Sequence, residues 1–289
     1  MSGEPTGVIH DIGYRHYDGP RGGRAPAFLA LSTNSLRGLF GLGRVTRAKI
    51  VPFALVMIML LPAVVSIAIM AVTGQPGLGY TAYAPAMQTV LAIFLAAQSP
   101  YLVAPDLRFR VLPLYMSRPI TVADYVGAKL AALIVAMFLL LAVPLTVLYA
   151  GELLVDPPGP GHGGDYATAM VMAVVHAVFL SAIGLALASV TPRRGLGVAA
   201  VIAFYLLLSA ISGVLFGVFT SASRDAAAEW AMLINPFFLL DAVQTGVFGT
   251  EPINGTGYPD GPVPAIAVAV VVVLGVWALI LRYRKASAS

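Results

Sequence analysis

The stretch VPFALVMIMLLPAVVSIAIMAV (residues 51–72) decides the fold class of this chain, because it is almost entirely apolar and carries no charged residue. In an α-helix that rises ~1.5 Å per residue, about 20 such residues cover the ~30 Å hydrocarbon core of a bilayer. A membrane β-barrel would instead show segments of ~10 residues with alternating polarity. The stretch therefore predicts a membrane-spanning α-helix.

The composition of the whole chain agrees with that prediction. Of its 289 residues, 59% are hydrophobic and 10% are charged, and the mean hydropathy is +0.88. A soluble domain is usually about a quarter charged. Inside lipid every backbone polar group needs an internal partner, which favours helices. The sequence contains no cysteine, so disulfides, thiolate catalysis and cysteine-ligated metals are excluded.

Five more apolar runs of similar length follow the first, so we expect an all-α integral membrane protein with six transmembrane helices. The predicted spans cover residues 51–72, 82–104, 130–150, 167–190, 197–219 and 263–281. We expect two parts along the chain, an N-terminal segment over residues 1–26 and a six-helix membrane domain over residues 27–289.

Lysine and arginine alternate between the connections. Residues 1–50, the 105–129 and 191–196 loops and the C-terminal tail hold sixteen of them, whereas the other connections hold only Arg224. Cytoplasmic loops of membrane proteins carry an excess of Lys and Arg. This asymmetry predicts a multi-pass protein of the bacterial cytoplasmic membrane whose N- and C-termini are both cytoplasmic.

Two segments outside the spans carry apolar patterns of their own. Residues 27–50 place their apolar side chains on about half of a helical wheel, which predicts an amphipathic helix on the inner membrane surface; a cytosolic helix packed on a partner is the alternative. In the outer loop, WAMLINPFFLLDAVQTGVFG (residues 230–249) is apolar but broken at Asn235-Pro236. We expect two short re-entrant helices there, with a surface loop as the alternative.

The sequence offers little for chemistry or for ion coupling. His176 is the one histidine or charged residue inside the predicted spans, and it is expected to be packed rather than to relay protons. No lysine follows a glycine, so a nucleotide-binding phosphate loop is absent. The segment HDIGYRHYDGP (residues 10–20) is interpreted as a docking segment rather than a metal site. We therefore expect no enzyme activity and no cofactor on this chain.

The loop before the third span is unusually polar and ordered in its pattern. Residues 106–115 mix apolar residues with Arg108 and Arg110, which predicts a short helix on the membrane surface that is interrupted at Pro113. Arg118-Pro119 predicts an extended turn. Thr121 and Asp124 have the spacing of a capping box that starts a helix, and that helix runs directly into the span. Tyr125 and Lys129, four residues apart, are expected to anchor at the lipid headgroups.

Three segments together give the chain its family resemblance. They are LPLYMSRPITVADYVGAKL (residues 112–130), TPRRG (residues 191–195) and INPFFLLDAV (residues 234–243). With six spans and an N-terminal surface helix, the chain resembles the permease subunits of bacterial type-2 ABC exporters. In that family the loop between spans 2 and 3 carries a coupling helix that seats on a separate ATPase. The family pattern matches at Ser117, Arg118, Pro119, Asp124, Tyr125 and Lys129.

The resemblance implies a role and partners for this loop. Residues 105–129 would be the coupling loop, with Asp106, Arg108, Arg110, Arg118, Pro119, Asp124, Tyr125 and Lys129 as its docking or positioning residues. The chain would form the translocation pathway of an ATP-driven exporter, and two ATPase subunits would bind the ATP and Mg²⁺.

A second permease subunit, identical or different, and membrane lipid are the other expected partners, and no nucleic acid is. Ser209, Gly213 and Gly217 form a small-residue face that serves either dimer packing or packing within one chain. Two other functions remain open at this point. One is a carrier or channel that works without ATP, and the other is an intramembrane lipid-modifying enzyme, for which the chain offers no cluster of carboxylates.

Overall fold

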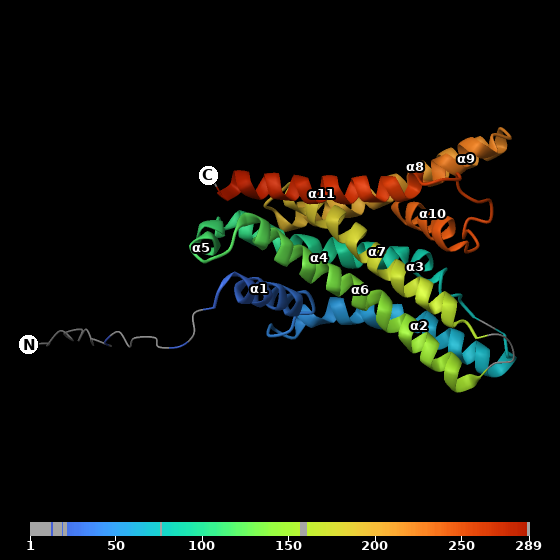
Figure 1. Cartoon of the computed structure of the whole chain (residues 1–289), viewed down its shortest axis with the longest axis horizontal. Coiled ribbons are helices and arrows are strands. Elements are labelled where there is room, and N and C mark those ends of the chain that lie inside the picture. Colours follow the sequence, from blue (N-terminus) through green and yellow to red (C-terminus); the bar gives the residue numbers. More distant parts are fainter. Residues whose placement is uncertain (1–12, 14–18, 20–21, 76, 157–160, 288–289) are drawn as a thin grey trace, which may run out of the picture.

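The computed structural model describes residues 13, 19, 22–75, 77–156 and 161–287, so most of the segment 10–20 lies outside the described residues. Within these ranges the chain is helical and has no strand (Figure 1). The helices are α1 (Arg24–Leu39), α2 (Arg47–Thr73), α3 (Tyr83–Ala86), α4 (Gln88–Arg108), α5 (Leu112–Met116), α6 (Val122–Val155), α7 (Gly163–Ser189), α8 (Arg194–Ser221), α9 (Asp225–Met232), α10 (Pro236–Phe248) and α11 (Val263–Ser287).

In the described part of the chain, six helices are long and apolar enough to cross a membrane, as in a multi-pass membrane protein: α2, α4, α6, α7, α8 and α11. Each contains the greater part of one predicted span. The second differs at one end, because its first residues form the separate helix α3, where the Tyr83 hydroxyl donates to the Met59 carbonyl of α2. The six-helix prediction is confirmed at this level.

The long helix α6 lies at the centre of the bundle. It contacts α1, α2, α4, α7 and α11 and buries Leu133, Met137 and Leu141 in the core. Its 34 residues correspond to ~51 Å of helix at ~1.5 Å per residue, well beyond the ~30 Å of a hydrocarbon core. The outer faces of α2, α8 and α11 are largely exposed and apolar, as expected of surfaces that face lipid.

The two ends of the bundle differ in charge. The start of α1, the short helix α5 and the end of α11 share one end, and α9 and α10 lie at the other (Figure 1). Every described lysine and arginine except Arg224 belongs to a segment at the first of these ends. We call it the basic end.

The predicted helix over residues 27–50 is wrong in its extent. Helix α1 ends at Leu39, a turn follows, and Arg47 starts α2. Gly41 and Gly43 hold positive φ angles of 67° and 79° in this turn, which side chains other than glycine rarely adopt. A Cβ on Gly41 would stand 2.7 Å from the Ala48 carbonyl oxygen. The chain therefore turns back tightly, and α1 packs along α6.

The apolar segment after α8 folds as two short helices. Helices α9 and α10 meet at 110°, and the break contains Asn235, whose side chain accepts a hydrogen bond of 2.9 Å from the Phe237 N–H. The predicted break at Asn235-Pro236 is thus confirmed. The Gln244 side chain of α10 donates to the Thr81 carbonyl at 3.1 Å, which ties this pair to the start of α3.

Candidate functional site at the basic end

Asp106, near the end of α4, contacts the side chains of two residues of α6. The Lys129 Nζ lies 3.0 Å from the Asp106 Oδ2, and the Tyr125 hydroxyl donates a hydrogen bond to the same oxygen. The Lys129 Nζ also lies 5.5 Å from the centre of the Tyr125 ring, where the π face attracts a cation. Tyr125 is fully buried and Lys129 is 8% exposed. This polar cluster therefore joins α4 to α6 inside the bundle.

Three tyrosine rings connect α5 to the spans. Tyr125 of α6 lies between Tyr115 of α5 and Tyr283 of α11, with ring centroids 5.2 Å apart in both pairs. Such distances are within the favourable range for aromatic pairs. Burial, and then the nearby Asp106 carboxylate, raise the pKa of the Tyr115 hydroxyl, so this ring stays neutral. Helix α5 is consequently held against two spans at once.

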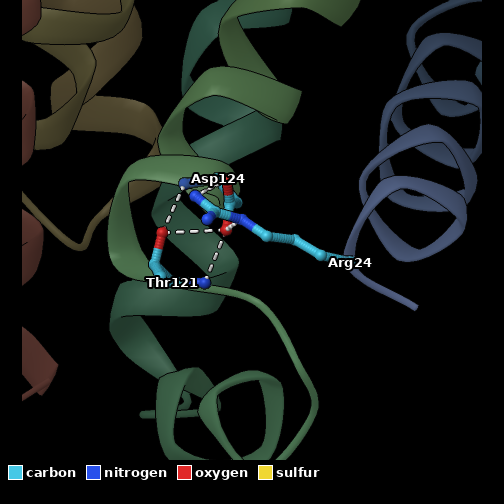
Figure 2. A network of polar contacts seen from close by, with 3 residues as sticks. All are labelled: Arg24, Thr121 and Asp124. Atoms are coloured by element: carbon cyan, nitrogen blue, oxygen red, sulfur yellow. Dashed lines mark hydrogen bonds and ion pairs between the residues drawn. The ribbon is translucent and has the colours of Figure 1, made fainter.

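The start of α6 is bound to α1 by a second charged contact, which Figure 2 shows. The Arg24 guanidinium donates to both carboxylate oxygens of Asp124, at 2.7 and 2.8 Å. Asp124 also accepts a hydrogen bond of 2.8 Å from the Thr121 N–H, and the Asp124 N–H donates to the Thr121 hydroxyl at 3.2 Å. The predicted capping box is confirmed, and its carboxylate additionally fixes α1.

Two loops of the basic end enclose a groove of about 560 Å³. It is lined by Leu107, Arg108, Arg110, Pro192 and Arg193. Arg110 has a φ of 51°, a left-handed conformation that is uncommon for residues other than glycine and that turns the chain from α4 into α5. Among the described residues, the three arginines have no carboxylate partner. The groove therefore presents guanidinium groups that are available to a partner.

Arg118 and Pro119 form the turn between α5 and α6. The Ile120 N–H donates to the Arg118 carbonyl at 2.7 Å, so the chain turns at Pro119, where a turn was predicted. Both side chains are exposed. The predicted interruption of a helix at Pro113 is wrong. Pro113 lies in the first turn of α5, where its missing N–H is not needed.

The structure thus separates the predicted loop residues by environment. Asp106, Tyr125 and Lys129 form one interior cluster, Arg108 and Arg110 lie in the groove, and Arg118, Pro119 and Asp124 belong to the turn and the cap. The expectation that Tyr125 and Lys129 anchor at lipid headgroups was wrong. Both side chains are buried between helices, because Asp106 supplies the partner that lipid was expected to provide.

Sequence reasoning missed three residues of this site: Arg24, Tyr115 and Tyr283. Arg24 is 100 residues away from its partner Asp124, and no local pattern connects them. Tyr283 comes from the last helix and meets Tyr125 only because α11 packs beside α6. The available signal was Tyr115 itself, an aromatic residue among the apolar residues of this loop.

An open pocket of about 400 Å³ lies between α4, α8 and α10, and Ile93 and Leu206 in its lining are exposed. Gln88, Tyr205, Ser209 and Asn235 contribute its polar groups. The Asn235 Nδ2 donates to the Ser209 hydroxyl at 3.3 Å, whereas the Tyr205 hydroxyl is buried without a partner among the described residues. The pocket is mostly apolar with a few polar groups, which is typical of small-molecule sites.

The other predicted positions are placed as follows. Gly213 and Gly217 are exposed on α8, and a Cβ on either would meet nothing within 4 Å. His176 is buried in α7, with its Nδ1 2.8 Å from the Met172 carbonyl. Among the described residues, no group of three or more His, Cys, Asp and Glu side chains is placed to hold a metal ion.

Comparison of the sequence with models of known protein families finds no match, and comparison with curated proteins finds none either. The fold and the geometry of the basic end therefore carry the functional argument.

Proposed function

We propose that this chain is the membrane subunit of an ATP-driven exporter, with its basic end in the cytoplasm of a bacterium. The distribution of charge supports this orientation, since the described cationic residues gather at one end of the bundle. The chain carries no phosphate loop, so the energy would come from a separate ATPase.

The observation that carries the proposal is the attachment of α5 to the bundle. The tyrosine stack holds α5 on α6 and α11, and the Asp106–Lys129 pair joins α6 to α4. The Arg282 Nε of α11 donates to the Ser189 carbonyl at the end of α7 at 3.1 Å. A displacement of α5 is therefore transmitted to four spans, which is what an ATPase-driven coupling helix requires.

The exposed guanidinium groups are the proposed contacts for the ATPase. Arg118 lies on the exposed turn beside α5, and Arg108, Arg110 and Arg193 face the groove. Guanidinium groups form paired hydrogen bonds with carboxylates, so acidic side chains on the ATPase surface are the expected partners. Asp106, Tyr125 and Lys129 are positioning residues in this scheme, because they are buried and contact one another.

The remaining parts of the family architecture are included in the proposal. Helix α1 would lie at the inner membrane surface, and α9 and α10 would dip into the outer leaflet as a re-entrant pair. The open face of α8 with Gly213 and Gly217 would pack against a second permease subunit. The pocket between α4, α8 and α10 would then lie beside the shared translocation pathway.

The test is purification of the tagged chain from its native membranes, followed by assay of the eluate for Mg-ATP hydrolysis and for a phosphate-loop protein by mass spectrometry. We expect both in the wild type and a loss of at least tenfold in Arg118→Glu. Arg37→Glu, which reverses an exposed charge on α1 outside the groove, is the matched control. Transport by the chain alone in proteoliposomes, without any ATPase, would refute the proposal in favour of a stand-alone carrier or channel.

A further inference from the structure

A second group of arginines converges on a pocket that plays no part in the proposed coupling. The pocket encloses about 360 Å³ between the α1–α2 turn, α4 and the start of α8. Arg44, Arg47 and Arg194 line it, two from the α1–α2 turn and the start of α2 and the third from the start of α8. No Asp or Glu is among its lining residues, and none of the three arginines pairs with a carboxylate of the described chain.

Two of these guanidinium groups share one aromatic ring. The Arg44 Cζ lies 4.7 Å from the centroid of the Tyr101 ring, and the Arg194 Cζ lies 5.7 Å from it. A Cβ on Gly38 would stand 2.5 Å from the Tyr101 hydroxyl oxygen, so the ring fits here only because residue 38 has no side chain. The two Cζ atoms are at most about 10 Å apart, which is close to the Debye length of about 8–10 Å at 0.15–0.1 M salt. The mutual repulsion of the two cations is relieved if an anion binds in the pocket that both line.

The backbone of the pocket also favours an anion. Arg47 and Arg194 are the first residues of α2 and α8, and helix N-termini carry a partial positive charge. The arginines supply the planar donors that match phosphate oxygens. The N-termini of α2 and α8 and three guanidinium groups thus lie at the same pocket.

Part of the pocket lining is apolar. Val51, Pro52 and Ala97 line it, and next to it Ile50 and Leu196 are 60% and 53% exposed on helices that face outward. A charged pocket that continues into an exposed apolar helix surface matches a phospholipid, whose headgroup and acyl chains need both. We propose that this pocket binds the phosphate of an anionic phospholipid headgroup, with the acyl chains lying along α2 and α8.

A lipid is favoured over an acidic protein segment because the pocket opens beside these exposed apolar side chains, whereas the groove at Arg108 and Arg193 borders the α4–α5 turn. The inference does not depend on the proposed coupling to an ATPase. It requires only that the basic end lies at a membrane surface, where basic pockets between helices bind anionic headgroups.

The test uses the purified full-length chain in a neutral detergent, titrated with a fluorescent phosphatidylglycerol. Neutral phosphatidylcholine and inorganic phosphate are the comparison ligands. We expect phosphatidylglycerol to bind saturably and the double variant Arg44→Gln/Arg194→Gln to weaken its binding about tenfold or more, since each cation near a lipid surface strengthens binding several-fold. Arg284→Gln/Lys285→Gln removes the same charge at exposed positions of α11 and should retain wild-type affinity.

Equal weakening in both double variants would overturn the proposal, because binding would then follow net charge rather than this pocket. If millimolar inorganic phosphate displaces the fluorescent lipid as well as unlabelled phosphatidylglycerol does, the pocket binds free phosphate, and the proposal of a lipid ligand is overturned. Wild-type lipid affinity in Arg44→Gln/Arg194→Gln, with loss of a co-purifying ATPase, would assign the pocket to a protein carboxylate instead. Tyr101→Phe keeps the aromatic ring that both cations contact, and its unchanged lipid affinity is the expected check on folding.

Discussion

Replacing Lys129 by methionine tests whether the charged pair at the start of α6 stabilises the fold. Methionine keeps the unbranched apolar part of the side chain but removes the ammonium group that lies 3.0 Å from Asp106. The Lys129 and Asp106 side chains are only 11% and 14% exposed. The substitution therefore leaves a carboxylate with little water and one remaining side-chain donor, the Tyr125 hydroxyl.

The size of the effect follows from this environment. Removing one partner of a fully buried ion pair costs about 3–5 kcal/mol. Because this pair keeps some exposure and Asp106 keeps the bond from Tyr125, we expect Lys129→Met to lower the free energy of unfolding by about 2–3 kcal/mol. The double variant Asp106→Asn/Lys129→Met should lose less unfolding free energy than the two single variants lose together, by at least ~1 kcal/mol.

The assay is unfolding in mixed micelles with increasing SDS, followed by far-UV circular dichroism of the helices. Lys285→Met is the matched control, since Lys285 is exposed near the end of α11 and should change stability by less than ~0.5 kcal/mol. A coupling energy below ~0.5 kcal/mol in the double-mutant cycle would refute the reasoning, because the two groups would then not be energetically paired.

Three further predictions rest on other contacts. Thr121→Ala removes the hydroxyl that caps α6 and should lower the free energy of unfolding in the same assay by about 1 kcal/mol, whereas Thr121→Ser should not; equal stability of the two variants would contradict the role of the cap. Gly184→Ala places a Cβ 2.6 Å from Leu95 and Ser99 and should cost about 1–3 kcal/mol, while Gly213→Ala, which meets nothing, should not lower stability. Gly213→Leu/Gly217→Leu should abolish cross-linking of a permease dimer in membranes, and Val273→Leu on the exposed face of α11 should leave it intact; a dimer that persists in both would rule out this face of α8.

The spans were predictable because each is a continuous apolar run, and solvent exclusion from the bilayer permits few other structures. The start of α6 was predictable for a different reason, since Thr121 and Asp124 carry a local capping signal. The break before α10 was marked by Asn235-Pro236 in the same way. Predictions of this kind succeed where the deciding contacts lie within a few residues.

The basic end depends instead on contacts between distant segments. Lys129 looked like a headgroup anchor because its partner, Asp106, lies in another helix. The turn after α1 was missed because an amphipathic pattern continues through it, although Gly41 and Gly43 indicated a reversal. Composition can tell that a side chain is cationic, but whether it meets lipid, a carboxylate or another cation depends on which helices become neighbours.

The order of synthesis gives the contact between α1 and α6 a further consequence. Arg24 leaves the ribosome 100 residues before Asp124, so at ~5–20 residues per second the first helix exists for about 5–20 s before its binding site is made. During that interval its apolar side chains have no place in the bundle. The newly made N-terminus must therefore be sheltered by the bilayer surface or by the insertion machinery, and shortening the chain between the two helices would shorten that wait.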